Sequence, residues 1–247
     1  MAYGKPEPKG FVTITFDDGL IDGANKARAL LEQFAMRASF FVVTGWVRPG
    51  RVKIRDPWNQ GRDHGSWADW QAIAASGHEI GSHTRSHINA AGKPARLLPL
   101  LLRRDIDGSY DDFIRHCGQP PVAIAMPFNA MTGTAKRLVQ RRFASALAGN
   151  HDLHYNCLSQ LDWYRLNSWA PDSDLPTATL CNIIEAIPGD HWLILQFHSL
   201  DDEGWMPIAA AKLTMILKCI AACDRITPIT VRDMVAKYKA PRGAARI

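Results

Sequence analysis

The fold class is decided by residues 11–19, which read FVTITFDDG. The first six residues are apolar or β-branched, which is typical of a buried strand. Two aspartates and a glycine follow, so the strand should run directly into a loop. Residues 24–34 then carry apolar side chains at helical spacing, and residues 38–44 form a second strand-like run. A strand, a helix and another strand in this order indicate a parallel sheet.

The same alternation continues to the end of the chain. Further strands are predicted at 79–82, 122–126, 145–148, 192–197 and near 229. Helices are predicted at 67–76 with Ser66 as N-cap, at 97–117 with a polar break near Asp107, at 208–222, and through residue 238. We therefore expect an α/β protein, a single distorted (β/α) barrel over residues 11–238, between tails at 1–10 and 239–247.

Composition narrows the possible partners and the compartment. The 247 residues are 47% hydrophobic and 21% charged, with a net charge of +5. Basic residues are scattered, which argues against nucleic-acid binding. No apolar run reaches about 18 residues, so no membrane span is expected. No leader-like segment opens the chain, which favours the cytoplasm. The five cysteines are odd in number and form no CxxC pair, so reduced buried thiols are expected, with Cys219 and Cys223 on one helix face. The oligomeric state is left open.

Asp17 and Asp18 are the first candidates for chemistry. Two adjacent carboxylates at a strand end repel each other unless a cation lies beside them. One could bind a metal ion while the other remains free to act as a base. The alternative is a plain turn, which Asp-Asp-Gly also describes.

His83 and His87 follow the strand predicted at 79–82. Histidines four residues apart can face the same side of a helical turn and so bind one ion. The alternative is a pair of surface histidines. Together with Asp18 they would make an Asp-His-His site with positions open for water and substrate.

Two further segments carry candidate residues. His198 closes the apolar strand predicted at 192–197, where it could serve as a general acid or as a hydrogen-bonded core residue. Asp162 could orient a histidine, and Trp163 could stack on a sugar ring.

Taken in order, these segments resemble the polysaccharide deacetylase family, whose catalytic unit is the NodB homology domain (carbohydrate esterase family 4). The motif TFDDG is followed about 65 residues later by SHTRSH. The resemblance spans roughly residues 11–235 and implies a divalent metal ion, with zinc as the first expectation. It implies Asp17 as general base, Asp18, His83 and His87 as metal ligands, and His198 as general acid oriented by Asp162.

The chain departs from the family pattern at two positions. Ala125 stands where the third motif usually has an arginine that holds the base, and Gln196 stands where a leucine usually lines the acyl pocket. We expect another basic or hydrogen-bonding side chain to contact Asp17, with Arg165 as first choice and Arg85 as second. The residues expected to contact substrate are Trp163, Phe128, Gln196 and Arg165.

The expected reaction is removal of an acetyl group from the nitrogen of a sugar, nucleotide sugar or glycan precursor. Hydrolysis of a cyclic amide or ureide is the alternative within enzymes, and an inactive carbohydrate-binding domain is the alternative outside them. The long loop at 45–65, which contains Trp46 and Trp58, is expected to fold over the end of the barrel that carries these residues. The competing expectation is that it packs elsewhere.

Overall fold

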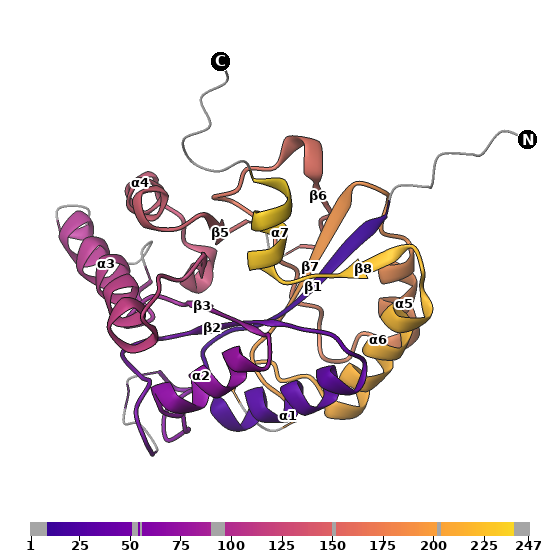
Figure 1. Cartoon of the computed structure of the whole chain (residues 1–247), viewed down its shortest axis with the longest axis horizontal. Helices are drawn as coiled ribbons and strands as arrows, with labels where there is room; N and C mark the ends of the chain where they lie inside the picture. The colour runs from indigo at the N-terminus through magenta and orange to yellow at the C-terminus, as the bar shows by residue number, and fades with distance from the viewer. Residues whose placement is uncertain are drawn as a thin grey trace, which may run out of the picture.

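The structure is a computed structural model that describes residues 9–50, 54, 56–89, 97–149, 152–201 and 204–239 (Figure 1). The strands are β1 (Gly10–Phe16), β2 (Ser39–Val42), β3 (Glu79–Ser82), β4 (Ala123–Ala125), β5 (Ser145–Leu147), β6 (Asn156–Cys157), β7 (His191–Phe197) and β8 (Ile226–Pro228). The α-helices are α1 (Ile21–Gln33), α2 (Trp67–Ala75), α3 (Leu98–Cys117), α4 (Gly133–Arg142), α5 (Thr177–Glu185), α6 (Ala210–Ala222) and α7 (Val231–Tyr238). Short 3-10 helices cover Pro127–Asn129 and Leu158–Gln160.

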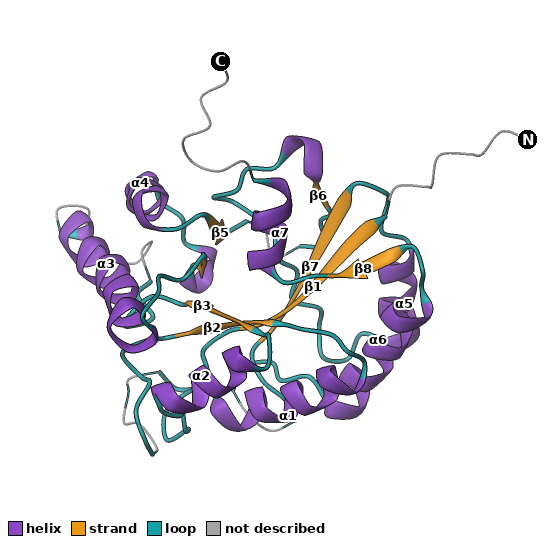
Figure 2. Cartoon of the chain, in the orientation of Figure 1, coloured by secondary structure: helices purple, strands orange, loops and turns teal. Residues whose placement is uncertain are grey.

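The strands form one sheet, in the order β5-β4-β3-β2-β1-β7-β6, with β8 paired to the start of β1. All pairs are parallel except β6 with β7. Most helices lie around the outside of the curled sheet (Figure 2). Parallel strands place their carboxyl ends at one edge, so loops that are far apart in sequence meet there.

The gap between β5 and β7 is spanned by residues 166–169. Isolated parallel bridges join Leu166 to Leu147 at one side and Trp169 to Leu195 at the other. This segment continues the ring of strands without forming a full strand of its own. The fold is therefore the distorted (β/α) barrel that the sequence predicts.

Alternation along the strands produces apolar cores on both faces of the sheet, one cluster in the barrel interior and two under the outer helices. Along β1, Val12 and Ile14 face outward and pack with the outer helices, where Leu31 and Leu217 are fully buried. Phe11 faces the barrel interior. Successive side chains point to opposite faces of a strand, so one short apolar run serves the cores on both faces.

Helix α7 closes the end of the barrel where the strands begin. Its N-cap Thr230 accepts a hydrogen bond from the Asp233 backbone, and the Arg232 N–H donates to the carboxylate of Glu79. Ser39 donates to the same Glu79 oxygen. A carboxylate at a helix N-terminus is favoured by the unpaired N–H groups there. Burial nevertheless raises the pKa of Glu79.

Most of the predicted elements are present, with shifts of up to three residues at their ends. Helix α2 begins after Ser66 as predicted, and Asp69 completes a capping box. The polar break expected near Asp107 is wrong, because α3 is continuous. Asp107 instead pairs with Arg103 and Arg142 on the outer side of α3. Strand β6 and helices α4 and α5 were not predicted.

The expectation of reduced thiols is wrong for two of the five cysteines. Cys181 on α5 and Cys219 on α6 form a disulfide, with their Cα atoms 5.8 Å apart. Cys117, Cys157 and Cys223 are free thiols. The pairing of cysteines on different helices depends on how those helices pack, which sequence spacing does not reveal.

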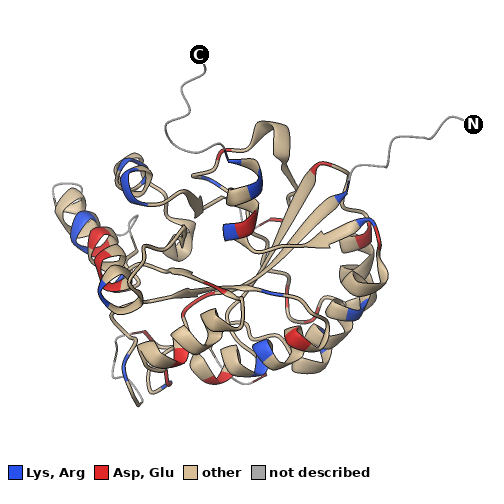
Figure 3. Ribbon diagram, viewed as in Figure 1, with Lys and Arg blue, Asp and Glu red and all other residues tan. Residues whose placement is uncertain are grey.

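The sequence predicted that the chain has no membrane span and that its basic residues are scattered. Within the part of the chain that the structure describes, no helix is long and apolar enough to cross a bilayer. Lys and Arg are distributed over several helices, with α3, α4 and α6 among them (Figure 3).

Candidate active site

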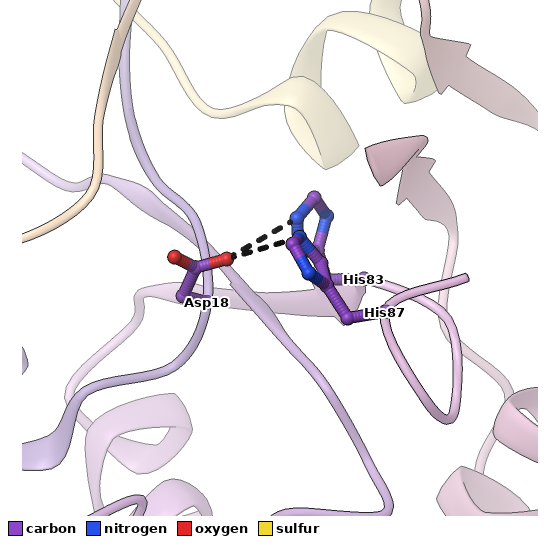
Figure 4. A group of neighbouring side chains, drawn as sticks. All are labelled: Asp18, His83 and His87. Atoms are coloured by element: carbon purple, nitrogen blue, oxygen red, sulfur yellow. Dashed lines mark ion pairs between the residues drawn. The ribbon is translucent and has the colours of Figure 1, made fainter. Parts of the chain in front are cut away.

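Asp18, His83 and His87 converge at the carboxyl ends of β1 and β3 (Figure 4). The Oδ1 atom of Asp18 lies 3.5 Å from Nε2 of each histidine. One ligand atom from each of the three residues fits within 4.8 Å of the others. Asp18 and His83 are both 3% exposed, so the cluster lies at the bottom of a recess and not on an open surface.

The donor atoms of this cluster fit a cation. The Nδ1 atom of His83 donates to the Ala125 carbonyl at 2.9 Å, and Nδ1 of His87 faces the Asp56 carboxylate at 3.4 Å. With Nδ1 protonated in both rings, each neutral imidazole directs an Nε2 lone pair at Asp18. Asp18 Oδ1 has no hydrogen-bond partner among the described residues. Three converging lone pairs repel unless a metal ion or a proton lies between them, so these residues could hold a divalent ion.

The charges around Asp18 favour its ionised form. Burial alone would raise the pKa of its carboxyl. The interaction with His83, followed by the charges of the nearby histidines, outweighs burial and holds the pKa of Asp18 well below its usual range. Burial would lower the pKa of His83, but the charge of Asp17, followed by the pairing with Asp18, raises it. The site therefore attracts positive charge to Asp18.

Asp17 lies next to the cluster and is also buried. Burial raises the pKa of the Asp17 carboxyl to about 6, with a smaller contribution from the charge of Asp18 that the nearby histidines oppose. Gln196 donates from Nε2 to Asp17 Oδ2 at 2.8 Å. The other oxygen, Oδ1, has no hydrogen-bond partner among the described side chains and backbone. A carboxylate with a raised pKa and one unoccupied oxygen is suited to accept a proton.

The prediction that a hydrogen-bonding side chain holds Asp17 is confirmed, with Gln196 as that residue. Both arginines that we named first were wrong choices. Arg165 donates to the Met131 carbonyl at 3.5 Å, and Arg85 pairs with Asp112 at 3.2 Å.

The loop predicted to cover this end of the barrel does so. Asn59 donates from Nδ2 to Asp18 Oδ2 at 3.1 Å and also to Asp56. Trp46 packs against the ring of His87, with centroids 5.4 Å apart. The hydrogen bond with His87 lowers the pKa of Asp56. The sequence indicated the loop and its tryptophans, but not Asp56 or Asn59, because a polar residue in a loop has no distinguishing pattern.

These residues surround a cavity of about 340 Å³. His198 contributes to its wall at the end of β7 and meets the ring of Trp205 edge-on, with centroids 4.8 Å apart. The lining residues are Asp17, Asp18, Asp56, Trp58, Asn59, His83, His87, Met126, Phe128, Asn129, Gln196, His198 and Trp205. Three aromatic rings therefore line a cavity whose base is acidic and imidazole-rich. Trp205 was not anticipated, since it follows His198 in a segment without periodicity.

The structure does not bring every candidate residue to the cavity. Asp162 forms an ion pair with Lys136 at 2.6 Å and accepts from the Tyr164 backbone, with its side chain 47% exposed. The ring of Trp163 packs with the barrel interior and lies under Lys239. Neither residue is among those that line the cavity. The role of Asp162 in orienting His198 stays a prediction.

Backbone strain gathers at the site. Asp18, Thr84, His87 and Phe128 all have positive φ angles, of 70°, 64°, 56° and 58°. This region of backbone space is costly for residues with a side chain, and such costs concentrate at functional sites. These four residues follow the carboxyl ends of β1, β3 and β4, which surround the cavity.

A barrel with an Asp-His-His cluster, a neighbouring carboxylate and a further histidine in one cavity defines a metal-dependent hydrolase type of site. The polysaccharide deacetylase family profile matches residues 4–143, which is more than half of the chain. The chain therefore belongs to the polysaccharide deacetylase family.

Several known proteins are similar to the chain. A gellan lyase from a Bacillus species is 33% identical over 87 residues, which are 35% of this chain and 3% of that much longer protein. Among solved structures, the Xyl-CE4 domain of a multidomain xylanase from the hindgut metagenome of Trinervitermes trinervoides has a TM-score of 0.61 at 15% identity, covering 94% of this chain and 91% of that one.

Two further solved structures share the fold. The Bc1960 peptidoglycan N-acetylglucosamine deacetylase has a TM-score of 0.60 at 20% identity, covering 93% and 89% of the two chains. A family 4 acetyl xylan esterase from Clostridium thermocellum, in complex with a cobalt ion, has a TM-score of 0.58 at 17% identity, covering 94% and 93%. At these identities the likeness establishes the fold.

Proposed function

We propose that this protein is a divalent-metal-dependent hydrolase that removes an acetyl group from the amide nitrogen of an N-acetylated carbohydrate. One observation carries the proposal: the Asp18, His83 and His87 cluster, Asp17 and His198 all line one cavity with three aromatic rings. Membership of the polysaccharide deacetylase family supports it, and one structural neighbour is a peptidoglycan N-acetylglucosamine deacetylase by name.

The residues divide the chemistry between them. A divalent ion held by Asp18, His83 and His87 would polarise the acyl carbonyl and lower the pKa of a bound water. Asp17 accepts the proton of the attacking water on its unoccupied oxygen. His198, which lines the same cavity, delivers a proton to the leaving nitrogen. General acid–base groups in such positions contribute about 10²–10⁴-fold in rate each.

We propose zinc as the ion. Two imidazoles and one carboxylate with an open position are typical of catalytic zinc. The cobalt ion in the Clostridium thermocellum esterase supports a divalent transition metal in this fold. Loading the metal-free protein in parallel with zinc, cobalt and iron(II) would rank the candidates by affinity and by turnover.

The aromatic wall supports a sugar as the substrate. Trp58 and Phe128 are each 56% exposed and line the cavity, so part of each ring is accessible to a ligand. Exposed aromatic rings of this kind stack on the apolar faces of sugar rings. Hydrolysis of a cyclic amide or ureide remains the alternative, because Gln196 presents an amide to the cavity where the family usually has an apolar leucine.

A substrate panel tests the proposal. Metal-loaded protein is incubated with N-acetylglucosamine oligomers, acetylated xylan, nucleotide sugars carrying N-acetyl groups and cyclic ureides, with acetate release or ring opening as the readout. We expect acetate from the N-acetylated sugars, and none from Asp17→Asn protein that retains its metal. Ring opening without acetate release would support the alternative instead. Bound metal without turnover on any substrate would support a binding domain.

A further inference from the structure

Gln196 connects the proposed base to a residue that no motif identifies. Its amide nitrogen donates to Asp17 at 2.8 Å, and its amide oxygen accepts from the Ser168 hydroxyl at 2.7 Å. All three residues are buried, with exposures of 7% for Gln196, 3% for Asp17 and 1% for Ser168. The three side chains form a continuous chain of hydrogen bonds. It starts at Ser168, in the segment 166–169 that bridges β5 and β7.

The register of three neighbouring chain segments produces this line. The Gln196 N–H donates to the Trp169 carbonyl, and the Trp169 N–H donates to the Ile194 carbonyl, each at 2.8 Å. On the other side of β7, the Asp17 N–H donates to the Phe197 carbonyl at 2.9 Å. Backbone pairing on both sides therefore fixes Ser168, Gln196 and Asp17 beside one another before any side chain is placed.

The Asp17 carboxylate determines which way the Gln196 amide faces. A carboxylate only accepts hydrogen bonds, so the NH₂ group of the amide must face Asp17. The amide oxygen must then face Ser168, whose hydroxyl can donate to it. A rotation of the amide by 180° would place its oxygen against the carboxylate and leave two buried polar groups in conflict. The hydroxyl of Ser168 donates to the amide oxygen at the other end and so anchors the amide in this position.

We propose that Ser168 and Gln196 are positioning residues that hold the Asp17 carboxylate with one oxygen fixed and the other directed at the reacting water. The inference rests on the proposed function, in which Asp17 is the base. Gln196, a neutral amide on β7, takes the place of the third-motif arginine in holding Asp17. Ser168 acts only through Gln196, so the two residues form one unit.

The test compares Ser168→Ala, Gln196→Leu and the double variant with the parent protein. Misplacing a catalytic group by about 1 Å can cost on the order of 10²-fold in rate. We expect kcat to fall about 100-fold for Gln196→Leu and about 10-fold for Ser168→Ala, with KM and metal content unchanged. Since the residues act as one unit, the double variant should lose no more than Gln196→Leu alone.

Ser145→Ala is the matched control. Ser145 is fully buried on β5, and its hydroxyl has no hydrogen-bond partner among the described residues. Its removal should leave kcat within twofold. Wild-type kcat in Ser168→Ala protein, or losses in the double variant that multiply, would overturn the proposal. If Gln196→Leu fails to fold, the milder Ser168→Ala variant still decides the question.

A second readout does not depend on turnover. A crystal structure of metal-loaded Ser168→Ala protein should show the Gln196 amide shifted from its position or the Asp17 carboxylate displaced. An unchanged pair would overturn the proposal even if no substrate were known. If instead the parent enzyme hydrolyses none of the panel but the carboxylate moves as expected, the proposed function fails and the positioning role stands.

Discussion

The disulfide between α5 and α6 gives a stability prediction that can be worked from the structure. It joins Cys181 to Cys219 across a sequence separation of 38 residues. The chain entropy lost by closing a loop of that length corresponds to about 3.9 kcal/mol at 25 °C. For domains of 150–250 residues, 1 kcal/mol changes Tm by roughly 2–4 °C. Replacing both cysteines with alanine should therefore lower Tm by about 8–16 °C.

The assay is thermal unfolding followed by circular dichroism, with and without a thiol reductant. Reductant should lower the Tm of the parent protein and leave the Cys181→Ala/Cys219→Ala variant unchanged. Cys223→Ala is the matched control, because Cys223 is a free thiol at the end of the same helix. The reasoning is refuted if reductant leaves the Tm of the parent unchanged, or if mass spectrometry of the unreduced protein counts five free thiols.

The same disulfide bears on the compartment. Disulfides persist in oxidising environments and are rare in a reducing cytosol. The cytoplasmic location stays a prediction, and the disulfide does not favour it. Thiol counting on protein recovered from its own cell would show whether the disulfide between Cys181 and Cys219 forms there.

Three further predictions concern the site and the core. Asp17→Asn and His198→Ala should each lower kcat about 10²–10⁴-fold with metal stoichiometry unchanged, measured by steady-state kinetics and elemental analysis, and a loss of metal would contradict the assigned roles. Asn59→Ala should weaken metal binding about 10–100-fold in a chelator competition, whereas the exposed Asn182→Ala should not. Burial lowers the pKa of His78 from 6.5 to about 4, so the folded state resists protonation. Stability should be complete above pH 6.5 and fall by up to about 3 kcal/mol as pH drops from 6.5 to 4, and urea unfolding of His78→Gln should show a smaller fall.

The long strands and the motif residues could be predicted because their signals are local. Strand β1 is seven residues of apolar or β-branched sequence, and its last residue leads directly into Asp17 and Asp18. Ser66 and Asp69 mark a helix start within four residues. Each of these features depends only on side chains close together in the chain.

The remaining features depend on contacts across the fold. Strand β6 is two residues long, and residues 166–169 make only isolated bridges, so neither has a periodicity to detect. The contact between Gln196 and Asp17 joins residues 179 positions apart. Gln196 drew attention only as a departure from the family pattern, and its partner became clear once β1 and β7 were seen to be neighbours.

Residues 56–59 of the loop over the cavity contact the proposed metal ligands and also form part of the cavity wall. Asn59 holds Asp18 at the end of β1, Asp56 holds His87 beyond the end of β3, and the two loop residues are bonded to each other. Trp58 lies between them and forms part of the cavity wall. A movement of this loop would therefore displace a metal-ligand support and an aromatic wall together. Asn59 and Asp56 come from the same short segment as Trp58. Metal binding should therefore stabilise the position in which Trp58 lines the cavity, and that position of Trp58 should in turn stabilise metal binding.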